Sequence, residues 1–273
     1  MTAPIRPVPV VPELEVSAAQ FLRLGELGGV GSWPVVLCLW PAGDSAAAAG
    51  PALAQADSEL IVSGLIGGGE PVTRVAEALA VLARPDAELA IRTFGGAGTR
   101  RICVARRGSD HAVAIRDRDR VRFGAVSVTA AADLTALVDR LLRDDRPPMR
   151  LSPVSAPSPD LVALLAAADA CGDPAGALRV LGVGAGELPA VRAALRSCRA
   201  RTEIVGHARA GAGIATTPGA VGVLDTDRGR IVLRPSKSPD GTSWTTLTSG
   251  TATALRQGVA LLVEALPAGR WFP

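Results

Sequence analysis

The order of elements along the chain predicts an α+β protein of two quasi-symmetric halves, residues 1–145 and 146–273. Each half reads as helices, then four strand-like runs, then one amphipathic helix. Short turn-like links separate the strand-like runs, which favours antiparallel meanders over parallel strands. With 273 residues, 48% of them hydrophobic, the chain is long enough to bury a large core. We expect the two halves to associate around a pseudo-twofold axis and to share one antiparallel sheet.

The first half opens with a helix that is marked at both ends. Ser17 and Gln20 form a capping box, Val16 and Phe21 stand at the positions of a hydrophobic staple, and Gly28 ends the helix. The short apolar run 35–40 favours a buried strand. Two helices over 52–65 and 71–83, four strands over 88–94, 100–107, 111–117 and 120–128, and a helix over about 130–143 complete this half.

The second half repeats this order after a proline-rich stretch, 144–159, which we interpret as a linker. Ser158 and Pro159 mark a helix start, a second helix opens at Asp173, and a third carries Leu188, Val191, Leu195 and Cys198. Four strands follow over 201–210, 219–225, 230–235 and 243–248, and the last helix covers about 251–265.

Arginine dominates the positive charge, because Lys237 is the only lysine and the formal net charge is +3. Nine arginines between Arg92 and Arg122 face only three aspartates, and such a stripe is able to hold phosphates. Nucleic-acid binding is therefore an alternative function. The arginines alternate with aliphatic residues, however, which is typical of a half-buried strand with a solvated outer face. The same positive face would equally meet an acidic protein partner.

The sequence matches none of the catalytic or cofactor-binding motifs that were considered. Lys237 and Ser238 lack the glycine cradle of a phosphate loop, the 182–186 run follows a helix instead of a strand, and no G-x-S-x-G occurs. The acidic run 225–229 lacks a carboxylate at the twelfth calcium-loop position and reads as a hairpin turn. Cys38 and Cys103 read as buried apolar residues, and the histidines suggest no metal spacing. We expect no enzyme, no cofactor and no metal.

The residues 1–12 contain four prolines and lack the apolar core of a signal peptide, and no run approaches the length of a membrane helix. We therefore expect a cytoplasmic protein without membrane insertion.

The second half carries a recognisable series of short motifs. Its runs are 203–208, 221–225, 228–230, 239–246 and 249–251, ahead of a helix that ends at 265–267. The first half agrees through its opening helix before Trp33 and Pro34, the runs 79–85 and 87–92, and the hairpin 101–117. Over roughly residues 16–267 the sequence resembles the EspG family, the type VII secretion chaperones of mycobacteria and related actinobacteria.

The resemblance implies a fold and a function. The fold is a central antiparallel sheet with flanking helical bundles, in two quasi-symmetric halves. The function is that of a cytosolic chaperone, not an enzyme. It would bind a PE–PPE-like heterodimer, one chaperone per heterodimer, at the apolar tip of the PPE bundle, and deliver it to the ESX machinery.

Family contacts come from the sheet, the loop after its second strand and the C-terminal helical bundle. We match the loop to residues 95–99 and the bundle to the helices of 159–198. The expected partner-binding residues are Leu161, Leu164, Leu165, Leu188 and Val191 of the bundle, and Gly96, Ala97 and Gly98 of the loop.

Overall fold

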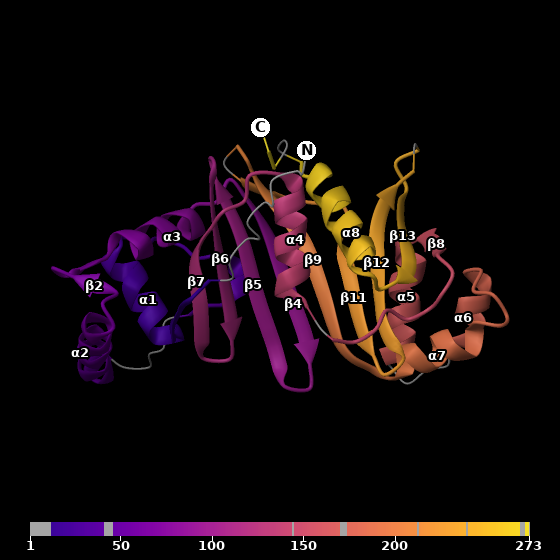
Figure 1. The fold of residues 1–273 in the computed structure, drawn as a ribbon, viewed down its shortest axis with the longest axis horizontal. Coiled ribbons are helices and arrows are strands. Elements are labelled where there is room, and N and C mark those ends of the chain that lie inside the picture. The colour runs from indigo at the N-terminus through magenta and orange to yellow at the C-terminus, as the bar shows by residue number, and fades with distance from the viewer. Residues whose placement is uncertain are drawn as a thin grey trace, which may run out of the picture.

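The computed structural model describes residues 12–40, 46–143, 145–169, 174–211, 213–238, 240–267 and 271–272. Its first half has the predicted order of elements (Figure 1). The helical part comprises β1 (Leu14–Ser17), α1 (Ala18–Leu27), the 3-10 helix η1 (Val35–Leu37), α2 (Ala46–Val62), the small hairpin β2 (Ile66–Gly67) and β3 (Glu70–Pro71), and α3 (Thr73–Ala83). The meander β4 (Ala87–Gly95), β5 (Gly98–Arg107), β6 (Asp110–Asp117) and β7 (Arg120–Val126) leads into α4 (Ala131–Leu141).

The second half repeats the pattern. It comprises β8 (Val154–Pro157), α5 (Ser158–Asp169), α6 (Ala175–Val180), α7 (Leu188–Arg196), β9 (Cys198–Ala210), β10 (Gly213–Thr216), β11 (Val221–Thr226), β12 (Gly229–Lys237), β13 (Ser243–Ser249) and α8 (Ala252–Glu264). In both halves a short strand runs directly into a helix, β1 into α1 and β8 into α5, and one helix follows the meander.

One antiparallel sheet joins the halves. Its strand order is β1-β7-β6-β5-β4-β9-β11-β12-β13-β8, with β10 paired to β9. The order is the same when read outward from the centre in either direction: a meander and then the short strand that precedes it in sequence. At the centre, β4 and β9 pair over nine residues, from Ala87 opposite Ala208 to Gly95 opposite Ala200. The predicted α+β fold with two quasi-symmetric halves is confirmed.

Helices cover both faces of this sheet. On one face α4 and α8 lie side by side across the central strands (Figure 1), above a core of aliphatic residues that includes Leu89, Val104 and Val223. On the other face α1, α3 and η1 cover the first half, above smaller residues such as Ala90 and Ala114. The helices α5, α6 and α7 take the corresponding place in the second half.

This two-sided burial corrects the expected solvated outer face of the arginine-rich strands. Residues 102–105 of β5 and 111–115 of β6 are all buried, so their middle sections face protein on both sides. The arginines gather toward the strand ends, where side chains reach past the covering helices.

Local corrections concern the run 35–40, the linker, and short strands that the sequence analysis did not predict, namely β1, β2, β3 and β10. The run 35–40 is not a strand: Val35–Leu37 form the 3-10 helix η1, and Arg101 and Arg116 donate to the carbonyls of Val36 and Leu37. These guanidinium groups take the role that a neighbouring strand would play. The 144–159 linker contains the edge strand β8, and β10 is an additional strand. The capping box is confirmed: Ser17 Oγ accepts from the Gln20 amide at 3.1 Å, and Gln20 Oε1 accepts from the Ser17 amide at 2.8 Å.

The linker is fixed against the start of β12. The Arg230 amide donates to Pro147 O, and Arg230 O accepts from the amides of Met149 and Gly250, all at 2.9 Å. A Cβ on Gly250 would lie 2.3 Å from Arg230 Cγ. Glycine at this position therefore permits the close approach of the two chain segments.

Candidate functional site

A groove of about 650 Å³ opens beside α5, on the sheet face that carries α1 and α5. Strands β9 and β11 form its floor, α5 forms one wall, and the end of β4 reaches its rim. The lining includes Phe94, Ser158, Leu161, Val162, Ala166, Arg201, Thr202, Glu203, Val205, Thr216, Thr217, Pro218, Gly219, Ala220, Val221, Gly222, Leu224, Leu233 and Thr245.

Two large apolar side chains stand exposed around this groove. Val162 on α5 is 65% exposed and Phe94 at the end of β4 is 44% exposed. Beneath them Leu161, Leu224 and Leu233 are buried. Exposed apolar side chains above a buried apolar base are typical of a protein–protein docking surface.

The floor of the groove also carries polar links between the two halves. The Arg92 guanidinium on β4 donates to Glu203 Oε2 on β9 at 2.7 Å, and the hydroxyls of Thr93 and Thr202 are 2.8 Å apart. Near the wall, the Ser158 and Thr245 hydroxyls are also 2.8 Å apart. The Arg92–Glu203 and Thr93–Thr202 contacts join β4 to β9 and so link the two halves, whereas the Ser158–Thr245 contact lies within the second half.

The expected bundle anchors are mostly core residues. Leu161, Leu188 and Val191 are 2%, 7% and 1% exposed, and pack together beneath the helices. The side chains of Leu164 and Leu165 lie outside the part of the chain that the structure describes. Helical spacing finds the face that packs inward, so the three described anchors are unsuited to direct contact with a partner.

The expected loop residues lie at the tip of the β4–β5 hairpin. Gly96, Ala97 and Gly98 are exposed, and Gly98 has a φ of +114°, which favours glycine. The Arg118 guanidinium on the next hairpin donates to Ala97 O at 3.3 Å. The three loop residues do not line the groove, but Phe94 from the same hairpin does. The structure thus brings the hairpin and α5 to one site through Phe94 and Val162, which the sequence interpretation missed.

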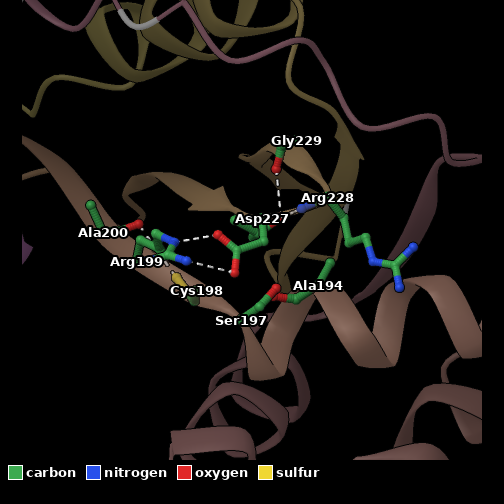
Figure 2. A network of polar contacts seen from close by, with 9 residues as sticks. Ala194, Ser197, Cys198, Arg199, Ala200, Asp227, Arg228 and Gly229 are labelled. Carbon is green, nitrogen blue, oxygen red and sulfur yellow. Dashed lines mark hydrogen bonds and ion pairs between the residues drawn. The ribbon is translucent and has the colours of Figure 1, made fainter.

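The acidic run 225–229 forms a tight turn between β11 and β12, as the sequence predicts. Figure 2 shows Asp227 at this turn, held by two contacts from the Arg199 guanidinium on β9. The hydrogen bond from Arg199 lowers the pKa of the Asp227 carboxyl. Below the turn Asp225 and Arg230 form a buried two-contact ion pair at 2.7 and 3.2 Å. Both carboxylates are bound by arginines and stabilise the hairpin. The run therefore resembles a calcium loop in sequence but not in function.

Several arginines of the first meander have structural partners. Arg106 donates to Trp271 O at 2.9 Å, Arg107 to Ala80 O at 3.1 Å, and Arg120 pairs with Glu15 at 3.1 Å. Arg100 lies 3.4 Å from Asp117. The charge excess that favours a phosphate-binding stripe in the sequence is therefore largely engaged in protein contacts.

Comparison with known proteins identifies the family of this chain. A family model described as the EspG family matches residues 17–260. The chain belongs to the EspG family. The resemblance read from the short motifs is confirmed over nearly the same span.

Two curated relatives of this EspG-family chain are secretion-associated proteins. The ESX-3 secretion-associated protein EspG3 of Mycolicibacterium smegmatis is 32% identical over 271 residues, covering 95% of this chain and 89% of that protein. The ESX-1 secretion-associated protein EspG1 of Mycobacterium tuberculosis is 30% identical over 210 residues, covering 74% of this chain and 69% of that protein.

A solved structure supports the fold. The Mycobacterium tuberculosis type VII secretion system chaperone EspG5, in complex with the PE25-PPE41 dimer, matches with a TM-score of 0.80 at 20% identity. The match covers 94% of this chain and 98% of that one. Among the described residues of the EspG-family chain, no helix combines the length and apolar character that crossing a membrane requires.

Proposed function

We propose that this EspG-family chain is a chaperone for a PE–PPE-like heterodimer in a type VII (ESX) secretion system. The groove beside α5 carries the proposal, because it places exposed Val162 and Phe94 over an apolar base. Support comes from the secretion-associated relatives and from EspG5, whose structure is a complex with the PE25-PPE41 dimer. The partner's apolar helical tip would occupy the groove, so that this surface is kept from water before delivery to the secretion machinery.

The asymmetry of the covering helices supports one heterodimer per chaperone. In the first half η1 packs against β4, β5 and β6, on the face where the second half has its groove. The 3-10 helix η1 thus occupies, in the first half, the place that the groove takes in the second half. The halves 1–145 and 146–273 would act as one unit, since the groove lies over their junction.

The family membership also supports a binding role instead of a catalytic one, in the cytoplasm and without a cofactor. Cell fractionation of the native producer, with the chain followed by antibody, tests the location. Recovery in the membrane or culture filtrate would contradict it.

Co-purification tests the binding proposal. The chain would be co-expressed with a tagged PE–PPE pair encoded beside it, and Val162→Arg and Phe94→Asp compared with the parent. Each replacement puts a charge on the groove, and we expect a loss of about 2 kcal/mol, or roughly thirtyfold in affinity.

Leu261→Arg is the matched control. Leu261 on α8 is 42% exposed and does not line the groove, and α8 covers the opposite face of the sheet, so this variant should bind like the parent. Parent-like binding by both groove variants would show that the groove is not the docking surface. A parent chain that binds no such heterodimer would overturn the proposed function.

A further inference from the structure

A second, smaller hollow lies further along the same central strands. It is formed by the start of β4, the end of β9, β10 and the segment before η1. The lining includes Ser32, Trp33, Pro34, Val35, Ala83, Pro85, Asp86, Ala87, Glu88, His207, Ala208, Arg209 and Ile214. Val205 and Thr216 line the groove, and His207 and Ile214, each two positions away on the same strand, line the hollow. A partner lying along β9 from the groove would reach it.

Glu88 is the unusual feature of this hollow. Glu88 is only 8% exposed. Within the described part of the chain, the one hydrogen-bonding partner of its carboxylate is the Cys103 thiol, whose Sγ lies 3.6 Å from Oε2. A thiol is a weak donor and compensates little of the cost of removing a carboxylate from water. Burial accordingly raises the pKa of Glu88. Burial also raises the pKa of the Cys103 thiol, which keeps it a donor.

The other charged groups around the hollow leave Glu88 without an ion pair. Asp86 accepts a hydrogen bond from the Gly108 amide at 2.7 Å. His207, directly opposite Glu88 in the β4–β9 register, contacts the Thr216 hydroxyl through Nδ1 at 3.0 Å. Arg209 is exposed, and burial and the Cys103 thiol, not an arginine, are what act on the Glu88 carboxyl. The hollow is therefore lined by two carboxylates, Asp86 and Glu88, and by one arginine, Arg209, so negative groups outnumber positive ones.

The rim of the hollow is apolar and open to water. Val35 is 84% exposed and Ile214 is 71% exposed, and the Trp33 ring and Pro34 complete the wall. An aliphatic stem ending in a cation matches this arrangement, because lysine and arginine stems cover apolar surface while their charged ends seek a polar partner. The hollow is small, about 100 Å³, which favours the compact ammonium group over the broad guanidinium fork.

We infer that the hollow receives a lysine side chain of the protein partner, with its stem between Val35 and Ile214 and its ammonium at the Glu88 carboxylate. The inference rests on the proposed function, since the partner in the groove would supply the lysine. It adds an electrostatic contact to an apolar one. A buried carboxylate rejects a partner that brings an apolar or acidic group to this position, which gives specificity beyond that of the groove.

A small-molecule probe tests the hollow without the heterodimer. The chain would be labelled with ¹³C at the glutamate carboxyl carbons, and n-butylammonium chloride titrated in at neutral pH. The Glu88 signal, assigned by its loss in Glu88→Gln, should shift as n-butylammonium is added, and the shift should saturate. Matched sodium chloride and the neutral n-butanol are the controls. A Glu88 signal that responds no more to n-butylammonium than to sodium chloride would overturn the assigned site.

Binding of the heterodimer tests the partner. Glu88→Gln keeps the shape of the side chain and removes its charge, and it should weaken binding roughly tenfold, as loss of a charge-assisted contact does. Glu77→Gln, at an exposed position on α3 outside the hollow, should bind like the parent.

The two experiments separate the possible failures. Equal affinities of Glu88→Gln and the parent would overturn the assignment of the lysine to this partner, even where n-butylammonium binds. Failure of the parent to bind any heterodimer would overturn the proposed function, and with it the partner assignment. The n-butylammonium titration would then still decide whether the hollow is a cation site.

Discussion

The buried ion pair between Asp225 and Arg230 should be the most sensitive polar contact beneath the groove. Both residues are more than nine-tenths buried, and the Arg230 guanidinium contacts both carboxylate oxygens, at 2.7 and 3.2 Å. The pair lies in the β11–β12 hairpin, which also supplies Leu224 and Leu233 to the groove. Asp225→Ala would leave the arginine charge buried without its partner.

The expected cost follows from that geometry. Removing one member of a buried pair typically costs about 3–5 kcal/mol, because the remaining charge stays out of water. A whole domain is stable by only about 5–15 kcal/mol, so Asp225→Ala should lower the free energy of unfolding by a large fraction. At about 2–4 °C per kcal/mol, the thermal midpoint should fall by roughly 6–20 °C.

Replacing both residues separates the charge penalty from the packing. In the double variant Asp225→Leu with Arg230→Met, no charge remains, and the unbranched methionine keeps a Cγ methylene against Gly250. Such replacements are often neutral or stabilising by about 1–4 kcal/mol. The double variant should therefore recover most of the stability that Asp225→Ala loses.

Urea denaturation, followed by far-ultraviolet circular dichroism and by tryptophan fluorescence, would give the free energies of unfolding. Coincident transitions by the two probes are required for a two-state treatment. A loss below about 1 kcal/mol in Asp225→Ala would refute the reasoning, because water would then solvate the Arg230 charge. A double variant less stable than Asp225→Ala would show that the pair contributes more than the cost of an orphaned charge.

Three further outcomes are expected. Ser17→Ala removes the hydroxyl that accepts from the Gln20 amide and should cost about 1 kcal/mol in urea denaturation; an unchanged midpoint would show that the cap contributes nothing. Gly250→Ala should destabilise the chain strongly or prevent folding, because the new Cβ would meet Arg230, whereas Gly31→Ala, with nothing within 4 Å, should leave the thermal midpoint nearly unchanged. His111 has a pKa lowered by burial, so stability should be lost as the pH falls below its ordinary value of 6.5, and His111→Gln should flatten that pH dependence of the thermal midpoint; an identical profile would contradict this assignment.

The His111 prediction has a structural basis beyond its burial. Nε2 of His111 accepts a hydrogen bond from Trp271 Nε1 at 3.0 Å, while Nδ1 lies 3.0 Å from Ser109 O and donates to it. Protonation would put a hydrogen on Nε2 and break the contact with Trp271. Unfolded chain binds the proton more tightly than folded chain, so acid favours unfolding.

The sequence by itself determined the local elements and their order. The capping box at Ser17, the glycine that ends α1, the hairpin links and the stripes of α4 and α8 each depend on residues within one or two turns of each other. Local hydrogen bonds and side-chain periodicity dominate at that range, so the pattern is sufficient. The repeated order then predicted two quasi-symmetric halves, and the series of short motifs identified the EspG family.

The tertiary structure alone decided which surfaces are exposed. Val162 is 65% exposed and Phe94 is 44% exposed, and only the packing of distant segments brings these two side chains, from α5 and from the end of β4, to one groove. The junction of β4 with β9 joins residues such as Arg92 and Glu203, which lie 111 positions apart. Periodicity shows that a helix or strand has an apolar face, but what covers the second face depends on long-range packing. The groove, the hollow at Glu88 and the 3-10 turn over the Arg116 strand all arise from that packing.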